Sequence, residues 1–251
     1  MFNINRLDRN HLLRHSFILM VAAHLTSIVN VLFHVVMGHN LSEEEYGIMV
    51  SMLGLILIFA TPMMAIQNTL THFSARLKQK ACSGDIWLLV QDWLKILALP
   101  AIIILLVGTL SSNYLAGFFN LPNRIPVIIT TVIFACMIFQ PVFSGALLGI
   151  QAFVLASVAG SSWGIMRLLI GIAVVILVAP LATSALTAQW TGVMCSLALS
   201  FLALHMILKK PHSYDQHIKG VDMYFFKSFF TLIGFGILMN ADVVIAKHYF
   251  R

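Results

Sequence analysis

The segment FVLASVAGSSWGIMRLLIGIAVVILVA, residues 153–179, decides the class of this protein. It carries one charged residue, Arg167, and it is longer than the roughly 20 apolar residues that one helical bilayer crossing takes. Six more apolar segments lie at about 16–37, 46–69, 87–110, 125–148, 185–208 and 226–248. The chain is therefore predicted to be an all-α, polytopic membrane helical bundle with about seven transmembrane helices.

The composition supports this class. Of the 251 residues, 60% are hydrophobic and 10% are charged, and the mean hydropathy is +0.94. A soluble domain has about 25% charged residues, so a globule of this composition would lack the polar surface that keeps it in solution. The three cysteines are far apart and form no C-x-x-C spacing, which indicates neither a disulfide framework nor a metal site. A soluble enzyme, a disordered chain and a secreted disulfide scaffold are excluded.

The basic residues predict the orientation of the bundle. With the N-terminus in the cytoplasm, eleven of the 15 Lys and Arg residues fall on the inner side, three fall on the outer side, and Arg167 lies within a membrane segment. Cytoplasmic loops of membrane proteins carry such an excess of positive charge. The net charge of +6 is thus explained by membrane orientation, and no nucleic-acid partner is expected.

One face of the helix predicted over 153–179 is polar. At 100° per residue, six residues fall within an arc of about 120°: Ser157, Gly160, Ser161, Gly164, Arg167 and Gly171. The G-x-x-x-G of Gly160 and Gly164 is typical of a close-packing seam between helices. A membrane-buried arginine normally faces the bundle interior, a water-filled cavity or a partner charge. The hypothesis for Arg167 is a cavity or anion site, and the alternative is a structural ion pair.

Asp242, in the segment 226–248, is the candidate partner of Arg167. Both residues are expected about 14–16 residues beyond the cytoplasmic ends of their helices, which places them at a similar depth at about 1.5 Å per residue. A similar depth permits an ion pair. The alternative is that Asp242 and Lys247 pair locally near the outer interface.

The helix predicted over 16–37 has a polar stripe of its own, because His24, Ser27, Asn30 and His34 share one arc. Two histidines on one face could relay protons, and the alternative is a set of inter-helix hydrogen bonds beneath a water-filled cavity. The candidate cavity residues are therefore Arg167, Asp242, Ser161 and Asn30, with His24 and His34 as candidates for proton coupling.

Other local signals are structural. Ser42 and Glu45 match the S-x-x-E capping box and predict a helix start there. Pro62, Pro100 and Pro141 lie inside apolar segments and predict kinks.

The sequence contains no H-E-x-x-H, G-x-S-x-G or Walker motif and no paired carboxylates in an apolar segment. No catalytic residue, metal or cofactor is therefore expected, and the protein is not expected to be an enzyme. Transport is the favoured class of function.

Three stretches, in this order, resemble the polysaccharide flippases (Wzx-like) of the MOP exporter superfamily. They are Glu45-Tyr46-Gly47 at the start of the second apolar segment, Leu147 with Gly149 and Gln151 at the end of the fourth, and Asn240-Ala241-Asp242 in the seventh. The resemblance implies two lobes of helices around a central cavity. Residues 1–222 would form the N-terminal six-helix lobe with a short cytoplasmic linker at its end. Residues 223–251 would form the first helix of a second lobe, so the chain is expected to be a fragment.

The resemblance also implies the function. Such flippases move undecaprenyl-pyrophosphate-linked oligosaccharide repeat units across the bacterial inner membrane by alternating access, for O-antigen, capsule or exopolysaccharide biosynthesis. The implied partners are the lipid-linked oligosaccharide, membrane lipid and a polysaccharide polymerase or glycosyltransferases. Arg167 would suit the pyrophosphate, because a guanidinium binds phosphate oxygens through a fork of donors.

Two other functions remain open at this point. A MATE-like cation-coupled drug exporter shares the architecture, but it predicts an acidic ion-binding first lobe. A non-transport scaffold subunit of a polysaccharide synthesis complex is the second alternative, and it predicts binding to a polymerase or a glycosyltransferase.

Overall fold

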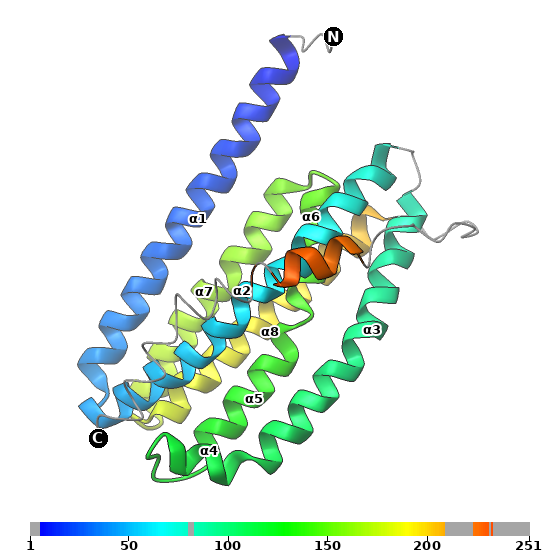
Figure 1. Cartoon of the computed structure of the whole chain (residues 1–251). Helices are drawn as coiled ribbons and strands as arrows, with labels where there is room; N and C mark the ends of the chain where they lie inside the picture. Colours follow the sequence, from blue (N-terminus) through cyan, green and yellow to red (C-terminus); the bar gives the residue numbers. More distant parts are fainter. Residues whose placement is uncertain (1–5, 80–82, 209–222, 231, 233–251) are drawn as a thin grey trace.

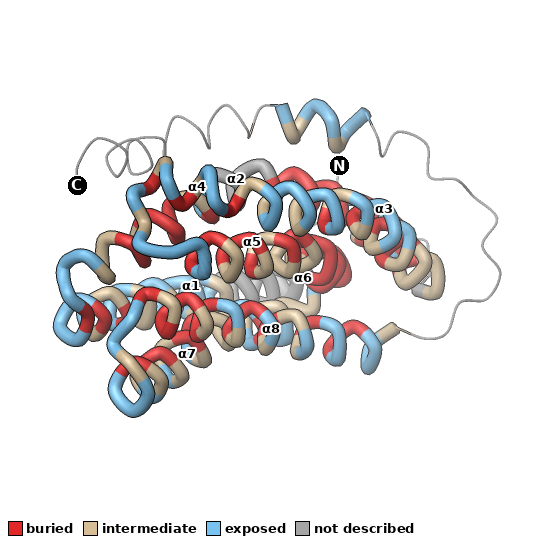
Figure 2. Tube along the Cα trace, turned by 90° about the horizontal axis from the view of Figure 1, so that it is seen from below, coloured by how far each residue is buried: buried red, intermediate tan, exposed pale blue. Residues whose placement is uncertain are grey.

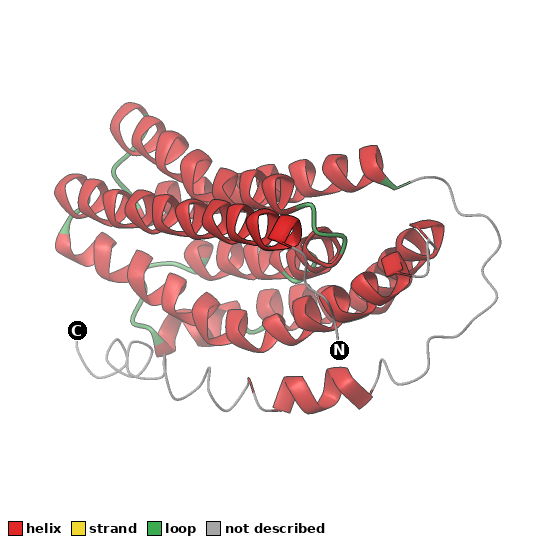
Figure 3. Ribbon diagram, turned by 90° about the horizontal axis from the view of Figure 1, so that it is seen from above, coloured by secondary structure: helices red, strands yellow, loops and turns green. Residues whose placement is uncertain are grey.

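The computed structural model describes residues 6–79, 83–208, 223–230 and 232, and this part of the chain is built from helices alone (Figure 3). The helices are α1 Arg6–Asn40, α2 Glu43–Gln79, α3 Ser83–Leu110, α4 Ser112–Phe118, α5 Ile125–Met137, α6 Gln140–Gly149, α7 Phe153–Leu177 and α8 Ala182–Ile207. The described residues 223–230 form one further short helix. The prediction of an all-α fold is confirmed.

Five helical stretches of the described residues are long and apolar enough to cross a membrane: Phe17–Asn40, Gly84–Leu110, Ile125–Gly149, Phe153–Leu177 and Ala182–Ile207. They coincide with five of the seven predicted segments. The predicted segment 46–69 lies within α2, which is not among the five. The predicted segment 226–248 lies mostly outside the described residues. A multi-pass membrane bundle is thus supported, and the count of seven stays a prediction.

The outward faces of the helices are apolar. Figure 2 shows exposed residues along the outer sides of the helices and buried residues on the sides that face one another. Leu99 and Leu110 on α3 are 65% and 83% exposed, and Val31 on α1 is 61% exposed. In water such surfaces mark interaction sites or aggregation, whereas lipid tails are as apolar as leucine and cover them at no cost.

Helix α7 lies between α1 and α8 and packs on both, whereas α2 packs chiefly on α6 and α5 packs on α3 and α8. Figure 1 shows the N-terminal part of α1 projecting beyond the other helices. The packed stretches of α1, α7 and α8 enclose the polar residues described in the next subsection.

A proline divides the fourth predicted segment into two helices. Helix α5 ends at Met137 and α6 begins at Gln140, with Pro141 in the first turn of α6. Proline has no N–H to bond to the carbonyl four residues earlier, so the predicted distortion at Pro141 is confirmed as a break. Helices α2 and α3 continue as single helices through Pro62 and Pro100.

Polar contacts fix both ends of α2. The helix begins after Ser42, whose Oγ accepts a hydrogen bond from the Glu45 N–H at 3.3 Å, as the capping signal predicted. The Glu45 carboxylate, however, accepts from the backbone N–H of Ala182 at the start of α8, where a negative charge stabilises the helix terminus. At the other end of α2, Lys78 Nζ donates to the carbonyl of Ile150 and to Gln151 Oε1 after α6, where a cation is favoured.

The predicted G-x-x-x-G does not form a tight contact between helices. A Cβ at Gly160 would meet nothing within 4 Å, and a Cβ at Gly164 would make only ordinary contacts with α1. A second pair with the same spacing, Gly145 and Gly149 on α6, lies against α2. A Cβ at Gly149 would be 2.7 Å from the Thr71 carbonyl oxygen, so the small residues there let the two backbones meet.

Replacing Gly149 by alanine is expected to lower the free energy of unfolding by about 1–3 kcal/mol, because the added methyl group forces α6 away from α2. The matched control is Gly160→Ala, which adds the same methyl group to α7 in open space. Unfolding by sodium dodecyl sulfate of the reconstituted protein, followed by circular dichroism, measures both. Equal stability of the two variants would contradict this packing.

Candidate functional site

Arg167 lies at the centre of the contact between α1, α7 and α8. It is 3% exposed and is the one charged side chain buried among the residues whose burial is described. Its Nη1 donates to Gln189 Oε1 on α8 at 2.9 Å, and its Nη2 donates to Asn30 Oδ1 on α1 at 2.7 Å. Gly192, one turn after Gln189, makes this possible, because a Cβ there would be 2.6 Å from the Trp163 carbonyl oxygen of α7.

Two aromatic rings flank the guanidinium. Its Cζ lies 3.8 Å from the ring centroid of Phe33 and 5.1 Å from that of Trp163. The faces of aromatic rings attract cations, most strongly where water is excluded. Phe33 is itself fully buried, so this contact stabilises the charge without adding a counter-charge.

No carboxylate in the described part of the chain lies within 4.0 Å of the guanidinium. Its Nε is buried and has no hydrogen-bond partner there. Asp242, the predicted partner, lies outside the described residues. The partners that the structure shows are therefore two neutral amides and two rings, and none of these partners in the described part of the chain carries a counter-charge.

A cavity of about 380 Å³ adjoins this cluster. The cavity, named here the polar cavity, is lined by residues of α1, α2, α5, α6, α7 and α8. Its polar lining residues are Asn30, His34, Gln140, Ser144, Gln189 and Ser196. The volume lies in the range of about 300–1,000 Å³ that small-molecule sites have. No acidic side chain is among the lining residues.

The wall formed by α6 and α8 holds a third amide, Gln140. Gln140, at the first position of α6, donates from Nε2 to Ser196 Oγ at 2.9 Å, and Ser196 donates to the Ala159 carbonyl of α7 at 2.7 Å. Gln140 Oε1 is buried and has no partner among the described residues. The break before Pro141 places this amide at a helix start, where its side chain reaches α8.

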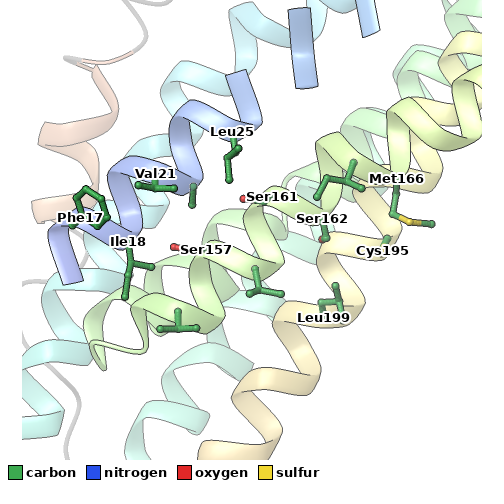
Figure 4. A pocket seen from close by; sticks show the side chains of 14 residues that line it. Phe17, Ile18, Val21, Leu25, Ser157, Ser161, Ser162, Met166, Cys195 and Leu199 are labelled. Carbon is green, nitrogen blue, oxygen red and sulfur yellow. The ribbon is translucent and has the colours of Figure 1, made fainter. Parts of the chain in front are cut away.

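Ser161 lies in a different pocket, of about 550 Å³, between α1, α7 and α8. Figure 4 shows this pocket, with Phe17, Val21 and Leu25 on one side and Ser157 and Ser161 on the other. Ser161 Oγ accepts a hydrogen bond from Thr26 Oγ1 at 3.1 Å, and the lining is otherwise mostly apolar. The structure thus brings Asn30 to Arg167 and places Ser161 elsewhere.

The two candidate histidines of α1 are in different surroundings. His34 is half-buried, lines the polar cavity, and has its Nδ1 3.4 Å from the Tyr46 hydroxyl. His24 is exposed, and its Nδ1 contacts the Met20 carbonyl of its own helix at 2.8 Å. Only His34 lies at the polar cavity, so the structure provides no contact that would connect the pair.

Sequence reasoning missed Gln189, Gln140 and Trp163. Gln189 and Gln140 are amides within apolar segments, and such polar residues usually face the interior of a membrane bundle. That signal could have selected both amides. Trp163 could not have been selected, because only its contact with Arg167 distinguishes it from other aromatic residues.

The chain matches no protein-family model, and comparison with curated proteins and with solved structures found no significant similarity.

Replacing Gln189 by leucine is expected to lower the free energy of unfolding by about 1.5–3 kcal/mol, because it takes a hydrogen bond from a buried charged group. The double variant Arg167→Met with Gln189→Leu should lose less, since it also removes the charge left without that partner. Unfolding by sodium dodecyl sulfate measures both. A double variant that is less stable than Gln189→Leu would contradict this view of the site.

Proposed function

We propose that this protein acts in moving undecaprenyl-pyrophosphate-linked oligosaccharide repeat units across the bacterial inner membrane by alternating access. The observation that carries the proposal is Arg167, a cation buried in a membrane-spanning helix beside the polar cavity, with no carboxylate partner among the described residues. A positive charge in such surroundings acts at low dielectric and attracts anions strongly. The pyrophosphate is the anionic group of the proposed substrate.

The architecture of the polar cavity fits a carrier better than a fixed binding protein. Its walls come from two stretches of chain that are far apart in the sequence, α1 with α2 and α5 through α8. Relative movement of these helices would change which side of the membrane the cavity faces, as carriers that expose one site alternately require. The family resemblance of the motif residues Glu45-Tyr46-Gly47 points in the same direction.

The sign of the buried charge separates this proposal from a cation-coupled drug exporter. A site for a cationic drug or a coupling cation needs a buried carboxylate. Among the residues whose burial is described, the buried charged residue is an arginine. We therefore prefer an anionic substrate, and we keep the exporter as an outcome of the test.

The test is complementation of a bacterium that lacks its own O-antigen-type flippase. The 251-residue chain, and separately its gene read to the natural stop codon, are expressed, and surface polysaccharide is measured. Rescue by either supports the proposal. Rescue by neither, together with increased drug resistance of the same strain, would favour the exporter. Co-purification of a polymerase without rescue would favour the scaffold function.

Arg167→Ala is made in whichever of the two expressed chains restores surface polysaccharide. The variant is expected to reduce surface polysaccharide to the level of the empty vector, because the positive charge beside the cavity is lost. The matched control is Arg124→Ala, since Arg124 is exposed just before α5. Immunoblots of isolated membranes check that both variants insert. Wild-type polysaccharide with the Arg167 variant would overturn the anion-site role.

A further inference from the structure

The hydrogen bonds of Arg167 fix how two amides face the polar cavity. An arginine side chain only donates hydrogen bonds, so the groups that it holds on Asn30 and Gln189 are the amide oxygens, Oδ1 and Oε1. Each amide has its –NH₂ group on the opposite branch of the same planar unit. Both residues line the polar cavity, and neither –NH₂ group has a hydrogen-bond partner among the described residues.

We infer that the amide nitrogens of Asn30 and Gln189 bind an oxyanion in the polar cavity, and that Arg167 acts through them as a positioning residue. Arg167 is not among the residues that line the cavity, whereas its two amide partners are. The inference rests on the proposed function for the identity of the oxyanion, a lipid-linked pyrophosphate, and it names the groups that contact it.

The electrostatics favour an oxyanion over a neutral polyol. The guanidinium behind the amides is positive, and its hydrogen bonds polarise the two amides so that their –NH₂ groups become stronger donors. Both effects favour acceptor oxygens that carry negative charge. Among the described residues that line the cavity, no acidic side chain opposes this.

The burial of Arg167 explains why the amides, and not the guanidinium, would contact the ligand. The guanidinium Cζ lies over the rings of Phe33 and Trp163, and two of the five N–H groups donate to the amides. Arg167 is 3% exposed and is not among the residues that line the cavity, so an oxyanion there would contact the amides and not the remaining N–H groups of the guanidinium. The amides, by contrast, keep their bonds to Arg167 while they donate from the opposite branch.

The first experiment measures binding to the purified chain in phosphatidylcholine nanodiscs. The probes are inorganic pyrophosphate and undecaprenyl pyrophosphate, with undecaprenol as the uncharged lipid, and Trp163 fluorescence is the signal in a variant whose other tryptophans are phenylalanine. Saturable binding of either pyrophosphate is expected. Binding of the lipid form alone assigns the site to a lipid headgroup, and binding of both includes the free anion. Absence of binding, or equal binding of undecaprenol, would overturn the inference.

Single variants separate donation by the amides from donation by Arg167. Asn30→Ala and Gln189→Ala should each weaken pyrophosphate binding about tenfold or more, as expected for one lost hydrogen bond to a charged group. If Arg167 bound the anion directly, each variant would free one Nη group, and binding would stay equal or become tighter. Asn40→Ala is the matched control, because Asn40 is exposed at the end of α1 and bonds to its own helix.

A measurement on the unchanged side chains makes the test independent of whether the variants fold. Solid-state NMR can detect the proximity of ³¹P in bound pyrophosphate to ¹⁵N in labelled side chains. Dephasing of Asn and Gln amide nitrogens supports the inference, and dephasing of Arg guanidinium nitrogens alone would overturn it. These binding readouts do not depend on transport. Failed complementation with intact binding would therefore contradict the proposed function and leave this inference standing.

Discussion

The packing at the centre of this protein depends on how the buried guanidinium of Arg167 is stabilised. A charged side chain in the middle of a membrane helix costs about 2.5–3.5 kcal/mol on insertion scales. Contacts with an amide from α1, an amide from α8 and two aromatic rings stabilise the charge of Arg167 and offset that cost. Because each partner comes from a defined position, the charge fixes how α1, α7 and α8 are rotated relative to one another.

Helix α2 supplies the second set of constraints. Its two ends carry opposite charges that bind complementary helix ends, Glu45 at the start of α8 and Lys78 after the end of α6. Gly149 lets α2 and α6 approach, and Gln151 adopts a left-handed backbone conformation with φ of 61° where the chain leaves α6. Glu45 and Gln151, which belong to two of the sequence motifs, thus have structural roles.

Much of the fold could be predicted from the sequence, because a bilayer imposes a length and an apolar composition on each crossing. Five predicted segments match apolar helices, and the break at Pro141 follows from proline chemistry. The packing of individual faces could not be predicted in the same way. Gly160 and Gly164 have the same spacing as Gly145 and Gly149, and only the neighbouring helix decides which pair forms a tight contact.

The same limit applies to the candidate site. The arc on the helix over 153–179 correctly indicated that Arg167 faces the bundle interior, since Arg167 is buried against α1 and α8. The arc could not assign its neighbours, because one helix does not specify the rotation of another. Ser161 belongs to the same arc as Arg167, yet it lines a second pocket. Depth along the membrane normal suggested Asp242 as a partner but could not suggest Gln189, which is neutral.

The neutrality of those partners has a consequence for a carrier. A carboxylate beside Arg167 would cancel its field, and an incoming anion would have to displace a strong, desolvated ion pair. The two amides bind the guanidinium through single hydrogen bonds and carry no counter-charge, so an anion of the proposed kind would gain attraction without breaking an ion pair among the described residues. In the proposed site both amide oxygens would stay on Arg167 when the cavity is occupied. The proposed site would then bind and release an anion with little rearrangement, and a carrier that must release its substrate on the other side of the membrane needs that property.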